Sequence, residues 1–289
     1  RIFVRLFRSK IAPCLAIDYS YMNIISFDAL RTLHLPNVRY IKPECMYDHL
    51  EEIKQADWLL FPQYWQLNAL IYGLKKRIFP SLASYMIGHD KVEMTRTFLT
   101  IVPNQHPYTV ITANTPYEAN RIWDTMYSPF VAKIPKSSMG NGVFLIESLD
   151  QWQQYIAISD LLYVQEYLPI DRDLRIIWVG NKIVSGYWRL QSDNGFHNNI
   201  SQGGQVEVAL IPKAAQELVT YLAKSLDVNH AGFDIAMVGS IPYVIEINRI
   251  FGNQGITSIQ SDVNTELLSY LNEQHLLSMV NTIERPNSL

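Results

Sequence analysis

The sequence predicts a chain of α/β and α+β class, in which an α/β region is followed by a region built on an antiparallel sheet. Over the first ninety residues, short strand-like and helix-like segments alternate, which is typical of a parallel sheet covered by helices. From residue 160 onward, longer β runs are joined by tight polar turns such as "VGNK", which indicates antiparallel hairpins.

In the α/β region, the expected strands are "RIFVRLF", "NVRYI" and "ADWLLFP". The expected helices are "MNIISFDALRTL", "MYDHLEEIKQ" and "QYWQLNALIYGLKK". A helix over 88–101 follows, and Asp90 is its predicted N-cap because its side chain can accept from the free N–H groups of the first turn.

Beyond this helix, the sequence predicts strands over 108–111, 129–135 and 143–148 and a helix over 115–126. The later strands are expected over 161–168, 173–180, 182–191, 205–212, 230–238 and 242–248. A helix over 212–227 interrupts them, with an apolar stripe formed by Ala215, Leu218, Val219, Leu222 and Leu226.

The composition indicates the cellular compartment and argues against some classes of binding partner. No run approaches the about 18 to 20 apolar residues that a membrane span needs, and "RIFVRLFRSK" carries four basic residues, unlike a signal peptide. Two cysteines without CxxC spacing agree with a reducing compartment, and a net charge of −3 argues against a nucleic-acid surface. We therefore expect a cytoplasmic protein without membrane or nucleic-acid partners. The chain begins with Arg and not Met, so a longer native N-terminus stays an alternative.

The run "YVIEINR", residues 243–249, places polar residues in an apolar strand. Strict alternation predicts one face with Tyr243, Ile245 and Ile247 and another with Val244, Glu246 and Asn248. A buried carboxylate needs a cation, a hydrogen-bond network or solvent to offset its desolvation.

A hairpin turn centred on Ser240 would place Asp234 opposite Glu246 and Gly232 opposite Asn248. Because facing carboxylates destabilise a hairpin, a divalent cation between them is the favoured explanation. Their hard oxygens favour Mg²⁺ or Mn²⁺. The alternative is that the two acids pair with Arg or Lys, and a one-residue bulge would break this register.

Lys133 lies in a predicted strand and is followed by the loop "KSSMGNG", with Gly140 and Gly142. Glycines let backbone N–H groups approach phosphate oxygens, and lysine supplies a compact positive charge. An ordinary Ser/Gly hairpin turn is the alternative.

The motif order "HDK", "VAKIPKSSMGNGV", "VQEYL", "DRDLR", "FHNNISQGG", "AGFDI" and "VIEIN" resembles the ATP-grasp ligases, and most closely the RimK-like carboxylate–amine ligases. The resemblance covers about residues 88–256 and implies an ATP-grasp fold. It implies an N-terminal pre-ATP-grasp α/β domain over 1–88, a central lid subdomain over 89–162 and a C-terminal antiparallel-sheet catalytic domain over 163–289, with ATP between the last two.

The resemblance also implies a nucleotide site. Lys91 and Lys133 would reach the phosphates, Lys133 also lying near the adenine, and Asp173 would bind the ribose, with Asp171 as the competing candidate. The remaining residues implied in nucleotide binding are the loop residues Ser138, Gly140 and Gly142 and the hinge residues Gln165, Glu166, Tyr167 and Leu168.

The implied metal ligands are Asp234, Glu246 and Asn248, so the cation would be the Mg²⁺ carried by ATP. The implied catalytic residues are Asn199, beside the phosphates, and Arg175 and Arg189, facing the transferred phosphate or the substrate.

The expected activity is ATP- and Mg²⁺-dependent ligation of a carboxylate to an amine of amino-acid, peptide or protein substrates, through an acyl phosphate. A kinase of the same fold and a nucleotide-binding regulator are the alternatives, and a homo-oligomer is left open. Relatives commonly continue after the asparagine with small residues and a proline, whereas this chain has Arg249, Ile250 and Phe251. Arg249 is a candidate for a substrate carboxylate or for a surface ion pair.

Overall fold

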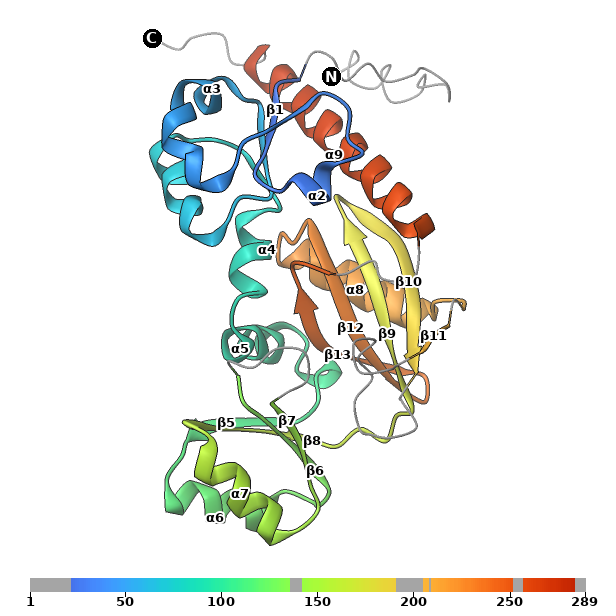
Figure 1. Cartoon of the computed structure of the whole chain (residues 1–289). Coiled ribbons are helices and arrows are strands. Elements are labelled where there is room, and N and C mark those ends of the chain that lie inside the picture. The colour runs from blue at the N-terminus through green and yellow to red at the C-terminus, as the bar shows by residue number, and fades with distance from the viewer. Residues whose placement is uncertain (1–21, 136–141, 191–204, 208, 252–256, 284–289) are drawn as a thin grey trace. The chain divides into compact units, whose positions relative to one another are not determined.

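The computed structural model describes residues 22–135, 142–190, 205–207, 209–251 and 257–283. The chain divides into two compact units, Arg1–Arg77 and Ile78–Leu289 (Figure 1). The expected boundaries after residues 88 and 162 stay predictions.

In unit 1, strand β1 (Ile24–Ser26) pairs in parallel with β2 (Val38–Tyr40) and with β3 (Trp58–Leu60). All residues of β1 and β3 are buried, as expected where a parallel sheet is covered on both faces. The helices of this unit are α2 (Ala29–Thr32), the 3-10 helices η2 (Pro43–His49) and η3 (Tyr64–Gln66), α3 (Leu50–Gln55) and the π-helix η4 (Ala69–Gly73). The predicted parallel α/β arrangement is confirmed for this part.

The helix predicted over residues 22–33 is wrong. Its first half forms β1, and α2 begins only after Asp28, whose side chain accepts from the backbone N–H of Arg31 at 3.0 Å. A short apolar run does not distinguish a buried strand from a buried helix by its periodicity. The strand predicted over residues 1–7 lies outside the described residues.

The first half of unit 2 carries a second sheet. Within the described residues it has four strands in the order β5-β8-β6-β7, all neighbours antiparallel. The elements are β4 (Ile78–Phe79), α4 (Leu82–Ile87), α5 (Lys91–Ile101), η5 (Pro103–Gln105), β5 (Thr109–Ala113), α6 (Pro116–Thr125), β6 (Phe130–Lys133), β7 (Val143–Ile146), α7 (Leu149–Ile158) and β8 (Leu161–Glu166). Ile122 of α6 and Trp152 of α7 pack with Phe130 in one core.

The second half of unit 2 is built on an antiparallel sheet, as predicted. Its described strands have the order β11-β10-β9-β12-β13, so β13 is an edge strand. The elements are β9 (Arg172–Val179), β10 (Lys182–Leu190), β11 (Gln205–Glu207), α8 (Lys213–Ser225), β12 (His230–Val238), β13 (Ile241–Asn248) and α9 (Thr257–Ile283). Figure 1 shows α8 across one face of this sheet, where Leu218 and Leu222 pack with Phe233.

Helix α5 connects the two sheets of unit 2. Met94 and Phe98 join the core beneath the antiparallel sheet, while the Thr95 hydroxyl lies 2.6 Å from the Tyr163 hydroxyl of β8. Asp90 caps the helix, as predicted, by accepting from the backbone N–H of Val92 at 2.7 Å. This places the first residue of α5, Lys91, between the sheets.

The sequence analysis missed α7 and α9. Helix α7 begins at a capping box formed by Ser148 and Gln151, a signal that the sequence does contain. Helix α9 buries Asn264 and His275 together with Leu267 and Leu271, so its buried face is not purely apolar and gives no simple stripe. Among the described helices, none combines the length and the hydrophobicity needed to cross a bilayer.

Candidate functional site

The predicted register of the β12–β13 hairpin is confirmed at its functional end. Asp234 faces Glu246, and Gly232 faces Asn248. The turn differs from the prediction. Val238 pairs with Ile241, so the turn consists of two residues and is not centred on Ser240. A register shift between Asp234 and Ile235 then leaves Ile245 without a facing partner, and this bulge restores the predicted pairs.

The bulge also changes which residues share a face. Val244 and Ile247 are both buried in the core with α8, at 0% and 2% exposure. The predicted division that placed Val244 with Glu246 is therefore wrong. Glu246 and Asn248 do share a face, because residues two apart in a regular stretch point the same way.

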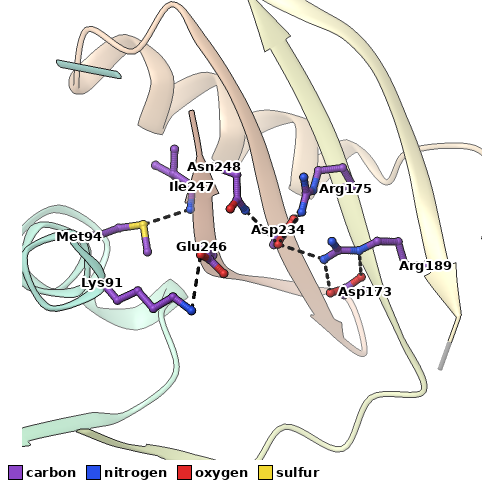
Figure 2. Close-up of polar contacts among 9 residues, drawn as sticks. All are labelled: Lys91, Met94, Asp173, Arg175, Arg189, Asp234, Glu246, Ile247 and Asn248. Atoms are coloured by element: carbon purple, nitrogen blue, oxygen red, sulfur yellow. Dashed lines mark hydrogen bonds and ion pairs between the residues drawn. The ribbon is translucent and has the colours of Figure 1, made fainter. Parts of the chain in front are cut away.

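Two arginines and two aspartates from β9, β10 and β12 form a buried group, which we call the ionic cluster: Asp173, Arg175, Arg189 and Asp234 (Figure 2). Arg175 and Asp234 are cross-strand partners, as are Arg189 and Asp173. Opposite charges thus face each other directly, which stabilises the sheet.

Every carboxylate in the ionic cluster is engaged. Arg175 donates from Nε to Asp234 Oδ1 and from Nη2 to Oδ2, the latter at 3.0 Å. Arg189 Nη2 lies 3.1 Å from Asp234 Oδ2, and its Nε donates to Asp173 Oδ1 at 2.7 Å. Asn248 Nδ2 adds a hydrogen bond to Asp234 Oδ2 at 3.3 Å. Burial would raise the pKa of Asp234, but Arg175 and Arg189 together hold it below the usual value.

Gly232 makes room for this cluster. A Cβ at this position would lie 2.9 Å from Arg175 Cδ and 3.0 Å from its Nη1. Glycine is therefore needed where the arginine crosses β12.

Asp173, a predicted ribose ligand, is engaged by an arginine in this structure, and its role stays a prediction. Because β9 begins at Arg172, the side chain of Asp173 lies within the sheet and is held by Arg189 at 2.7 and 2.5 Å. A ribose hydroxyl would have to displace this bidentate pair. Asp171, the competing candidate, precedes the strand and its side chain is 90% exposed.

A second group of charges meets at the edge of β13, and we call it the open charged set: Lys91, Lys133 and Glu246. Lys91 Nζ lies 3.8 Å from Glu246 Oε1, the only ion pair of Glu246 within the part of the chain that the structure describes (Figure 2). Lys133 donates to the neutral Gln165 Oε1 at 2.7 Å and lies 5.6 Å from the centre of the Tyr163 ring.

The ammonium group of Lys133 has a lowered pKa. Burial lowers the pKa of its ammonium from 10.5 to about 8; Glu246 raises it and Lys91 lowers it. A lysine that is desolvated and lacks a close counter-ion gains when an anion arrives. The open charged set is thus suited to bind a polyanion.

The donor chemistry beside these lysines fits a hard cation in part. Glu246 keeps its carboxylate oxygens beyond hydrogen-bond distance of Lys91, and Asn248 uses its amide nitrogen toward Asp234, which leaves the amide oxygen as a donor atom. Such oxygens suit Mg²⁺. Asp234 is different, because its oxygens are engaged by two arginines, the pairing that the sequence left open as an alternative. Its role as a metal ligand stays a prediction.

The predicted hinge is partly bound into the sheet. Glu166 donates its backbone N–H to the Tyr108 carbonyl oxygen at 2.9 Å, and its side-chain Oε1 accepts from the backbone N–H of Tyr108 at 2.7 Å. Tyr167 and Leu168 follow the end of β8. Gly142 closes the β6–β7 hairpin by accepting from Ile134 N at 2.7 Å. Ser138, Gly140 and Asn199 lie outside the described residues.

The sequence analysis missed His106, which lies behind Lys133. It is 2% exposed, with Nδ1 2.8 Å from the carbonyl oxygen of Val244. A single histidine outside any motif gives no sequence signal. Arg249 stacks 4.1 Å above the Tyr85 ring and, among the described residues, forms no ion pair, so the expected surface ion pair is not observed.

Solved structures with a similar fold define the class. The ATP-grasp ligase PsnB, in complex with a phosphomimetic variant of its minimal precursor, Mg and ADP, matches with a TM-score of 0.64 at 13% identity, over 88% of this chain and 99% of that chain. D-alanine–D-alanine ligase from Bacillus anthracis matches with a TM-score of 0.60 at 15% identity, over 86% and 88% of the two chains. The fold is that of the ATP-grasp ligases.

Sequence comparison then gives the family. The model of the RimK-like ATP-grasp domain matches residues 91–271, and the chain belongs to this family. A probable alpha-L-glutamate ligase of Enterobacter sp. (strain 638) is 30% identical over 155 residues, 51% of each chain. A ribosomal protein bS6–L-glutamate ligase of Escherichia fergusonii is 29% identical over 135 residues, 45% of each chain. The chain spans about half the length of the curated relatives it matches.

Proposed function

We propose that the protein ligates a carboxylate to an amine at the expense of ATP, releasing ADP and phosphate. The observation that carries the proposal is the convergence of Lys91, Lys133 and Glu246 from α5, β6 and β13 in a chain of the RimK-like family. Lys91 and Lys133 bind the ATP phosphates: Lys91 has Glu246 at 3.8 Å, beyond hydrogen-bond distance, and among the described residues Lys133 has no carboxylate within ion-pair distance. A Mg²⁺ ion held by Glu246 and Asn248 would neutralise phosphate charge.

The proposed chemistry has two steps. A substrate carboxylate oxygen attacks the γ-phosphorus of ATP, the bond to the bridging oxygen of ADP breaks, and an acyl phosphate forms. The amine nitrogen then attacks the acyl carbon, the carbon–oxygen bond to phosphate breaks, and the nitrogen loses a proton to solvent. No enzyme nucleophile is required, so the task of the protein is to position the reactants and to stabilise charge.

The two arginines of the ionic cluster border this reaction. Arg175 and Arg189 use Nε and Nη2 on aspartates, and a guanidinium has five N–H donors, so Nη1 of each remains for an oxygen of the transferred phosphate. The aspartates hold these groups in a fixed orientation before ATP arrives.

The remaining nucleotide contacts follow from what is accessible. We assign the ribose to Asp171, because Asp173 is held by Arg189. The adenine is proposed to lie against the hinge over residues 165–168, where β8 ends.

The substrates are proposed from the relatives. Both curated relatives are named as L-glutamate ligases, one of them acting on ribosomal protein bS6. We therefore propose L-glutamate as the amine and a peptide or protein carboxylate as its acceptor. A cytoplasmic location and the absence of nucleic-acid and membrane partners stay predictions from composition.

The test is an ADP-release assay over L-glutamate and other amino acids, each with short peptides, followed by mass spectrometry of the products. Ligation gives a product with the mass of the two substrates minus water. A substrate that gains one phosphate would identify a kinase, and ATP binding without either product would identify a regulator. Either result would overturn the proposed ligation.

A further inference from the structure

A chain of hydrogen bonds runs from Lys133 to the backbone of β13 through two side chains outside the ionic cluster. Lys133 Nζ donates to Gln165 Oε1 at 2.7 Å. Gln165 Nε2 lies 2.9 Å from Thr109 Oγ1 and 3.4 Å from His106 Nε2. His106 Nδ1 lies 2.8 Å from the Val244 carbonyl oxygen. Gln165 and His106 are 3% and 2% exposed, so both side chains are shielded from water.

The partners fix the direction of each hydrogen bond. The carbonyl of Val244 can only accept, so His106 carries its proton on Nδ1, and in the neutral ring Nε2 is an acceptor. Thr109 Oγ1 donates to the carbonyl oxygen of Pro107 at 2.7 Å, a shorter contact than its 3.3 Å to His106 Nε2, so we place the hydroxyl hydrogen toward Pro107. Two acceptors therefore face the amide nitrogen of Gln165, and its amide oxygen must face Lys133.

We propose that His106 is a positioning residue for Lys133, acting as a neutral acceptor that fixes the orientation of the Gln165 amide and ties the sheet of Lys133 to the strand of Glu246. Only its consequence for ATP binding rests on the proposed function. The orientation of Lys133 itself is a property of the protein without nucleotide.

The surroundings of His106 keep it neutral. Burial lowers the pKa of its ring to about 4; the Val244 carbonyl raises it and the charge of Lys133 lowers it. Phe98 of α5 packs against the ring with the centroids 5.3 Å apart. A protonated ring would present a donor to the Gln165 amide nitrogen and would favour the reversed amide, with N–H groups toward the ammonium.

Lys133 depends on this oxygen because its other neighbours do not replace it. Among the described residues, the groups that act on it besides Gln165 include Glu246 of β13, Lys91 of α5 and Tyr163 of β8. Within the described residues, neither Glu246 nor any other carboxylate comes close enough to form an ion pair with Lys133. The Gln165 oxygen is therefore the group that stabilises the ammonium by a hydrogen bond.

Two variants of His106 separate the acceptor from the packing. In His106→Gln, the amide group can reach the position of Nε2 and supply an oxygen acceptor. In His106→Asn, the shorter amide can still donate to Val244 but provides no acceptor for Gln165. The full-length, nucleotide-free variants are treated with an acetylating reagent at pH 7, and modification of Lys133 is followed by peptide mass spectrometry. Lys213, whose side chain is 89% exposed, serves as the internal reference.

Only the neutral amine reacts, so loss of the fixed acceptor should speed acetylation of Lys133. We expect His106→Asn to react about tenfold faster than the original protein and His106→Gln to stay within about twofold, since it restores the acceptor. Equal rates in all three proteins overturn the proposal. Should His106→Asn not fold, Gln165→Met removes the same oxygen and should react as fast as expected for His106→Asn; an unchanged rate there overturns it equally.

ATP affinity then separates this inference from the proposed function. His106→Asn and Gln165→Met should each weaken ATP binding about tenfold, and the double variant should be no weaker than either, because both act through one oxygen. Additive losses would contradict the chain of hydrogen bonds. If acetylation changes as expected but the original protein does not bind ATP, the positioning role stands and the proposed function fails.

Discussion

The ionic cluster lies within the sheet β11-β10-β9-β12-β13, whereas the open charged set gathers at the edge strand β13 from α5, β6 and β13, and the two groups satisfy their charges differently. In the ionic cluster, two aspartates and two arginines are buried and meet within hydrogen-bond distance. In the open charged set, Lys91 and Glu246 remain 3.8 Å apart, and the acceptor of Lys133 found among the described residues is a neutral amide.

This difference shows where the protein can bind charge. A buried pair whose carboxylates are fully engaged loses much if one partner is removed, and each arginine here keeps only Nη1 for a ligand. A desolvated ammonium without a close counter-ion gains when phosphate arrives. The ionic cluster is therefore the frame of the site, and the open charged set is its binding surface.

The largest expected effect breaks the ionic cluster. Asp234→Ala would leave two buried guanidinium groups with fewer partners, and we expect a loss of about 3–5 kcal/mol in the free energy of unfolding. Urea unfolding followed by circular dichroism measures it. Glu217→Ala, in the exposed pair with Lys213, is the control and should change stability little. Equal stability of the two variants would show that the cluster is not the frame.

Removing Glu246 from the open charged set should act on turnover instead. Glu246→Ala should lower kcat by about 100-fold or more, because its interaction is strongest in the transition state, while much of the nucleotide affinity remains. Steady-state ADP release measures kcat, and circular dichroism must show a folded variant. A folded variant with near-normal turnover would make Glu246 an ion-pair partner of Lys91 only.

His106, which contacts Gln165 behind the open charged set, makes the stability of the protein depend on pH. The pKa of its ring is about 4 in the folded protein against a usual 6.5, so between these pH values the ring is protonated in the unfolded chain and neutral in the folded protein. The stabilisation is complete above pH 6.5 and is lost as the pH falls toward 4, by about 3 kcal/mol in total. The free energies of unfolding of the original protein and of His106→Gln should therefore approach each other as the pH falls, and urea unfolding at several pH values measures this. Parallel curves would contradict this.

The smallest expected effect concerns the ribose. Asp171→Ala should weaken ATP binding by about threefold to tenfold, as for the loss of one exposed hydrogen-bonding group. Titration with ATP and with 2′,3′-dideoxy-ATP measures it, because the dideoxy nucleotide should bind both proteins alike. A difference that persists with the dideoxy nucleotide would remove Asp171 from the ribose site.

Two features that position the site were predictable from the sequence. The capped start of α5 and the facing of Asp234 and Glu246 followed from local patterns and are confirmed. The reason for the second agreement was not predictable, since a two-residue turn alone would have placed Ile245 opposite Asp234 and only the bulge at Ile245 brings Glu246 there.

The same limit applies to Arg189 and Asp173. The β9–β10 hairpin starts with Val179 opposite Lys182, a register that would place Arg172 opposite Arg189. A shift between Ile183 and Ser185 brings Asp173 there instead. Because a bulge is set by packing across the sheet, the pattern of one strand does not reveal it. The ionic cluster was thus visible in the sequence as separate residues but not as one group.

We propose that the open charged set binds the phosphates of ATP, and calorimetric titration of ATP into Lys133→Met tests this most directly. The control is Lys182→Met, because Lys182 lies at the start of β10, outside the open charged set, and pairs with Glu266. With Mg²⁺ present, we expect Lys133→Met to bind ATP at least about tenfold more weakly than the original protein and Lys182→Met to bind it as tightly as the original protein. Equal affinity of both folded variants would contradict the claim.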